Sequence, residues 1–124
     1  MPGVMWTMHS DALNKLGMRL RIPGLDQEDW DLIFADSTRV GEFCDLYESG
    51  VLSVEEQQLL MQLTVASLDH LLTPEPETPL RLRVEMLLQK HRDLHEKVIT
   101  YWAHQNKAIV WNVTPMMRRL RDAP

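Results

Sequence analysis

His91 and His95 are the residues whose type and spacing most directly suggest chemistry. They stand four residues apart, so on one α-helix both imidazoles would face the same side and could bind one metal ion. A third ligand would have to come from another segment, and the best candidates are His70 and its neighbour Asp69. The zinc-protease pattern also needs a glutamate directly after the first histidine, and Arg92 stands there instead. The sequence therefore offers metal-ligand candidates without a complete metal motif.

Packing explains the same two histidines at least as well. On a helical wheel, His91 and His95 lie in the middle of an apolar stripe, where buried histidines are usually hydrogen-bonded to neighbouring helices. We therefore predict that both are core residues, and we expect no metal or other cofactor. A metal- or histidine-dependent enzyme that uses His91, His95 and His70 is the rival hypothesis, and a structural or adaptor protein that uses the basic C-terminal segment is the third.

Other catalytic patterns are missing from the chain, and we predict no catalytic residue. Cys44, the single cysteine, falls on an apolar helical stripe and is expected to be an inert buried thiol. Ribonucleases of the HEPN type carry an arginine four to six residues before a histidine on one helix. Arg92 is too close to His95 for that pattern, and Arg83 is too far from His91. There is also no glycine-rich phosphate loop.

Charge is distributed unevenly along the 124 residues, whose net charge is −5. The chain through Leu80 has 4 basic and 14 acidic residues, whereas the rest has 9 basic and 4 acidic. Acidic surfaces repel nucleic acid and attract basic protein surfaces, and the basic C-terminal segment lacks the interleaved aromatics of a nucleic-acid platform. We therefore expect a protein partner and no nucleic acid, although these acids could simply solvate two helices. The predicted partner-binding residues are Asp29, Asp31, Asp36, Glu42, Asp45 and Glu48.

The segment 53–72 is predicted to be the helix around which the others pack. Ser53 and Glu56 match a capping box, which begins a helix by satisfying two backbone donors reciprocally. Apolar side chains then cover most of the helix circumference, so other helices must surround it. His70 is expected on its apolar side.

Four further segments carry helix signals, and the sequence predicts an all-α, compact single-domain bundle of about five helices over residues 1–124. The signals are an N-cap at Asp26 for 26–35, with Trp30, Ile33 and Phe34 buried; an N-cap at Ser37 for 37–49; Thr78-Pro79 for 79–104; and Thr114-Pro115 for a last short helix. Residues 1–24 favour a helix, with a short strand pairing between 18–22 and 108–111 as the alternative.

The compartment follows from what the chain lacks. A single cysteine permits no intrachain disulfide, the N-terminus does not resemble a signal peptide, and no apolar run approaches the ~20 residues that a membrane helix needs. We expect a soluble, cytoplasmic protein with no membrane association, present as a monomer or a homodimer.

Three runs of sequence resemble a family of small helical bacterial proteins. They are YESGVLSVEEQQLLMQLTVASLDHLL, LHEKVITYW and VTPMMRRL, and the resemblance spans roughly residues 42–120. Proteins of that family are encoded beside secreted polymorphic toxins and are thought to act as immunity proteins. The resemblance implies a non-enzymatic module that binds and neutralises a cognate toxin, here through an acidic helical face that meets a basic surface. The binding motif of the nuclease-colicin immunity proteins is not found.

Overall fold

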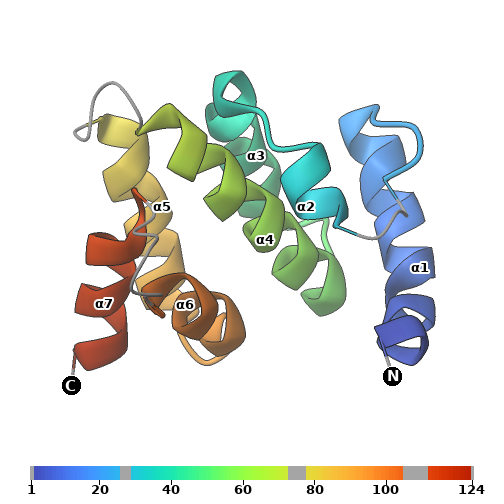
Figure 1. Ribbon diagram of the computed structural model, residues 1–124. Helices are drawn as coiled ribbons and strands as arrows, with labels where there is room; N and C mark the ends of the chain where they lie inside the picture. Colours follow the sequence, from blue (N-terminus) through green and yellow to red (C-terminus); the bar gives the residue numbers. More distant parts are fainter. Residues whose placement is uncertain (1, 26–28, 73–77, 105–111, 124) are drawn as a thin grey trace.

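The chain folds around one long helix, α4. A computed structural model describes residues 2–25, 29–72, 78–104 and 112–123, and in these residues the chain is all-α. Figure 1 shows α4 running diagonally through the middle, with α1 on one side and α5 to α7 on the other. The elements are α1 (Pro2–Leu20), α2 (Trp30–Ile33), the 3-10 turn η1 (Ser37–Arg39), α3 (Val40–Glu48), α4 (Val54–Leu71), α5 (Pro79–Lys90), α6 (Glu96–Ala103) and α7 (Thr114–Asp122).

The start of α4 is the capping box that the sequence predicts. The Ser53 hydroxyl accepts from the Glu56 backbone N–H at 3.1 Å, and the Glu56 carboxylate accepts from the Ser53 backbone N–H at 3.3 Å. Beyond it α4 contacts α1, α2, η1, α3 and α5. Leu60, Met61 and Leu68 are fully buried, so the prediction of a central, surrounded helix is confirmed.

The prediction of one helix over 79–104 is wrong in its middle. The Thr78 cap and Pro79 begin α5 as expected, but α5 ends at Lys90 and residues 91–95 form turns before α6 begins. His91 and His95 have φ and ψ of −117° and 40°, and −108° and 17°, outside the helical region. No glycine or proline causes this break. The tertiary contacts of His95, described below, override local helix propensity.

The segment before α3 also differs from the sequence prediction. The N-cap of α2 is Asp29, in a left-handed conformation with φ of 57° and without a side-chain cap bond. The predicted cap Asp26 lies outside the described residues. η1 is capped by Asp36 instead of Ser37, because the Asp36 carboxylate accepts from the Thr38 backbone N–H at 2.9 Å. Consequently α2 has four residues, and Ile33 is exposed rather than buried.

Two other predictions concern segments near the ends of the chain. Residues 18–20 belong to α1, so the strand alternative is wrong there; its proposed partner 108–111 lies outside the described residues. The N-cap of α7 is Val113 instead of Thr114. The Thr114 hydroxyl donates to the Trp102 carbonyl at 2.9 Å and so ties α7 to α6.

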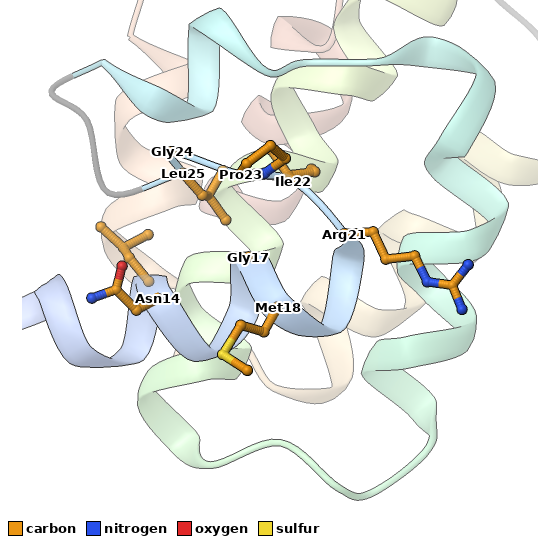
Figure 2. A pocket seen from close by; sticks show the side chains of 9 residues that line it. Asn14, Gly17, Met18, Arg21, Ile22, Pro23, Gly24 and Leu25 are labelled. Carbon is orange, nitrogen blue, oxygen red and sulfur yellow. The ribbon is translucent and has the colours of Figure 1, made fainter.

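The C-terminal end of α1 is closed by a tight turn that depends on Gly17. The Ile22 N–H donates to the Gly17 carbonyl at 2.8 Å, and the chain from Ile22 to Leu25 folds back over the helix. Figure 2 shows this turn beside Met18, around a pocket of about 480 Å³. A Cβ at position 17 would lie 2.9 Å from the Ile22 carbonyl oxygen and 3.1 Å from Leu25 Cβ. The helix can accept only glycine there without moving the turn.

We expect Gly17→Ala to lower the free energy of unfolding by about 1–2 kcal/mol, since the clash with backbone outweighs the gain in helix propensity. Gly41→Ala is the matched control. Its Cβ would meet only Leu80 Cδ2, at an ordinary 3.7 Å, so we expect a gain of about 0.5–1 kcal/mol. Urea unfolding of both variants tests the pair. Equal effects of the two substitutions would contradict a close turn at Gly17.

Candidate functional site

The histidine pair forms a buried contact with α3. His95 is 1% exposed, and its Nε2 lies 2.6 Å from the Tyr47 hydroxyl oxygen. His91 is half-buried, with its ring centroid 6.5 Å from that of His95. Burial lowers the pKa of His95 to about 4, with a further contribution from His91, and burial raises the pKa of Tyr47 to about 12. Both partners of the hydrogen bond are therefore neutral at pH 7, and the bond holds α3 to the turn at 91–95.

The other metal-ligand candidates do not join this pair. His70 is exposed in the last turn of α4, not on its apolar side as predicted. Asp69 accepts from the Val113 backbone N–H at 3.1 Å through its carboxylate, so it positions the start of α7. Within the described ranges, no group of three or more histidine, cysteine or acidic residues could hold a metal ion.

Cys44 is buried on α3, as the sequence predicts. Burial raises the pKa of its thiol to about 11. Because the thiolate is the reactive form, Cys44 is an inert core residue at neutral pH.

The predicted acidic face is divided by arginines. Glu42 pairs with Arg39, whose Nε lies 2.9 Å from the carboxylate, and this hydrogen bond lowers the pKa of Glu42. Asp45 and Glu48 both pair with Arg83 of α5, at 2.7 and 2.8 Å. Three of the six predicted binding residues are thus in ion pairs within the chain, and two arginines offset two of their three charges.

The Asp36 carboxylate is also bound by neighbouring groups of the chain. Its carboxylate accepts from the backbone N–H and the hydroxyl of Thr38, and the side-chain hydrogen bond lowers the pKa of Asp36. This is the role of a cap. Asp36 therefore stabilises η1, and the predicted binding face is reduced to Asp29 and Asp31.

Asp29 and Asp31 differ from the other four acids. In the part of the chain that the structure describes, neither forms an ion pair. Asp29 is exposed and Asp31 is half-buried. Burial raises the pKa of Asp31; the backbone N–H groups of Asp31 and Leu32 oppose this, and the charge of Asp29 adds to it. A partly desolvated carboxylate beside a second one is an arrangement that a cation would stabilise.

These two carboxylates border a pocket of about 300 Å³ between α2 and α6, which we call the α2–α6 pocket. Two of its lining apolar side chains are exposed, Leu32 at 50% and Tyr101 at 55%, and Ile33, which follows Leu32 on α2 without lining the pocket, is 57% exposed. The exposure of Ile33 contradicts the prediction that it is buried. The pocket is lined by Asp29, Asp31, Leu32, Gln62, Lys97, Val98, Tyr101 and Trp102.

A second hollow continues the α2–α6 pocket along α6. It has a volume of about 270 Å³, extends past Glu96 to His95, and shares Gln62, Lys97 and Val98 with the first. The two hollows therefore adjoin at these three shared residues. The sequence predicts the acids of α2 as binding residues. It does not predict the contribution of α6, because α6 begins only after the unpredicted break at residues 91–95.

Comparisons with protein-family models, with curated protein sequences and with solved structures gave no match for this chain. Among the described helices, none combines the length and apolar character needed to cross a membrane. The α2–α6 pocket is where apolar surface, a cavity and two carboxylates without an ion pair among the described residues meet.

Proposed function

We propose that the protein is a non-enzymatic binding module that captures a protein partner with a basic surface through the α2–α6 pocket. The observation that carries the proposal is the exposure of Leu32, Ile33 and Tyr101 beside Asp29 and Asp31. Single exposed apolar residues are ordinary, but apolar side chains grouped at a pocket and bordered by charge resemble the core and rim of a protein interface.

Charge complementarity indicates the kind of partner. The first 80 residues carry a net charge of −10, which would steer a basic surface toward this part of the molecule and speed association at low salt. Because Glu42, Asp45 and Glu48 are paired with arginines, they contribute less to this field than their number suggests. Asp29 and Asp31 are the carboxylates best able to contact the partner directly.

The resemblance to immunity proteins suggests what the partner is and what binding does to it. The partner would be a bacterial toxin with a basic surface, and the protein would neutralise it by binding. An acidic and apolar pocket on a small helical protein suits that role, since binding alone needs no reaction by the protein. The partner to test first is the product of the neighbouring gene, by co-purification and then by titration.

In that titration, we expect Asp31→Lys to weaken binding by at least about 2 kcal/mol, roughly thirtyfold, because it places a like charge against a basic surface. The matched control is Asp45→Lys, which makes the same change of charge at an acid that already pairs with Arg83. We expect it to weaken binding by less than about 0.7 kcal/mol, roughly threefold. A larger loss in Asp45→Lys than in Asp31→Lys would move the interface to α3 and contradict the proposal.

A further inference from the structure

We propose that the α2–α6 pocket is a socket for one arginine side chain on the surface of the protein partner. This inference rests on the proposed function and names the residue that the pocket recognises. Carboxylates stand at one side of the pocket on α2, and apolar and aromatic side chains of α6 stand at the other. An arginine combines an apolar stem with a planar cationic end, and so matches both sides.

The size of the pocket suits a single side chain. Its volume of about 300 Å³ is at the lower end of the range of about 300–1,000 Å³ for small-molecule sites. A cofactor or a whole helix needs more enclosed surface than this. An exposed side chain from a partner can enter such a pocket while the apolar residues around it, Leu32 and Ile33, contact the partner's surface.

The electrostatics of the pocket favour a cation with several donors. Asp29 and Asp31 make no ion pair in the described residues, although Arg39 and Arg83 do pair with other acids on α3. A guanidinium presents five N–H donors in a fixed fork and can donate to both oxygens of one carboxylate, or to two carboxylates, at once. The Gln62 side-chain amide at the same pocket can accept a further hydrogen bond.

The apolar walls explain why the guest would be arginine rather than lysine. Val98 and the buried Trp102 line the pocket beneath Tyr101, and the two aromatic rings meet edge to face with centroids 5.5 Å apart. A guanidinium is more weakly hydrated than an ammonium and packs flat against aromatic surface. A lysine would have to give up a tightly held hydration shell to reach the same depth.

Lys97 is the side chain in the pocket that opposes a cationic guest. It lines the pocket, yet it pairs with neither Asp29 nor Asp31 within the described residues. Its charge repels a second cation nearby. Removing that charge should therefore strengthen arginine binding, an effect that a purely structural role of the pocket would not produce.

The test uses the full chain and a minimal probe, N-acetyl-arginine methylamide, titrated to millimolar concentrations and followed by amide and indole NMR signals. We expect saturable shifts centred on Asp31, Leu32 and Trp102. The neutral citrulline counterpart should bind at least about tenfold more weakly, since it keeps the shape and loses the charge. Asp31→Asn should abolish saturation, and Lys97→Met should tighten binding by about threefold. Asp31→Asn is expected to fold normally, which its amide spectrum checks, because it removes a partly desolvated charge.

Equal binding of the arginine and citrulline probes, or equal binding of a lysine probe, would overturn the inference. Shifts spread evenly over the acidic residues and unchanged in Asp31→Asn would overturn it as well. The outcome is separable from that of the proposed function. If Asp31→Lys weakens partner binding but the arginine probe does not bind, the proposed interface is supported and the arginine site is contradicted. If the probe binds but partner binding does not depend on Asp31, the arginine site is supported and the proposed function is contradicted.

Discussion

Lowering the pH from about 6.5 to about 4 should reduce the free energy of unfolding by up to about 3 kcal/mol through His95 alone. Its pKa is about 4 in the folded protein against 6.5 as the ordinary value, because of burial and then of His91. Below pH 6.5 the unfolded chain binds a proton at this histidine that the folded chain does not. The stabilisation is therefore complete above pH 6.5, falls progressively toward pH 4, and does not change further below that.

Urea melts at several pH values would measure this effect, with the double variant His95→Leu and Tyr47→Phe as the reference. Changing both residues avoids leaving the Tyr47 hydroxyl buried without a partner, which would add its own cost. The difference in stability between the wild type and the double variant should shrink as the pH falls. The difference is the quantity to use, because the raised pKa of Asp31 acts in the opposite direction. A flat difference curve would contradict a buried neutral His95.

Replacing Arg19 by leucine should cost about 2 kcal/mol at pH 7, the second large effect. Arg19 Nε donates to the Glu56 carboxylate at 2.9 Å, and the Glu56 side chain is 6% exposed. Removing one member of a buried pair leaves a charge without compensation and costs about 3–5 kcal/mol. The Arg19 side chain is 38% exposed, so solvent screens part of this interaction. We therefore expect a cost of about 2 kcal/mol, below the range for a fully buried pair.

The pH dependence of the Arg19→Leu variant identifies the cause. Burial by itself would raise the pKa of Glu56, but hydrogen bonds from the Ser53 backbone and from Arg19 outweigh it, and the pKa is lowered. The stability from this carboxylate is thus present above its ordinary pKa of 4.5 and is lost as the pH falls through the lower folded value. The cost of Arg19→Leu should therefore diminish below pH 4. Lys15→Leu, an exposed change on the same helix, should stay within about 0.5 kcal/mol at every pH.

The parts of the fold that the sequence predicted are those decided by neighbouring residues. The Ser53–Glu56 capping box and the Thr78-Pro79 start both require only a few adjacent residues. The end of α5 at Lys90 was not predictable in this way. The apolar spacing continues through the break, and the contact that settles it, from His95 to Tyr47, joins residues 48 positions apart.

The candidate site was likewise predictable only in part. Its carboxylates, Asp29 and Asp31, were identifiable from the concentration of acids before residue 48. Their distinction from Glu42, Asp45 and Glu48 was not, because the cation that pairs with two of the latter is Arg83 on α5. The aromatic wall was missed for the same physical reason. Tyr101 is exposed on α6, whose separate start at Glu96 the sequence does not predict.

The central position of α4 has a consequence for how the protein opens. Because α4 contacts α1, α2, η1, α3 and α5, its amide hydrogens between Leu60 and Leu68 can reach solvent only when the surrounding helices separate, so their exchange should report global unfolding. By contrast, α6 and α7 make their most extensive contacts with each other. We expect α6 and α7 to unfold together as one cooperative unit, at a lower free energy than global unfolding. Tyr101 and Trp102 belong to α6 and would leave the pocket in that step. Hydrogen exchange would then show α6 and α7 losing protection together, before α4, and a ligand held in the α2–α6 pocket would slow that step.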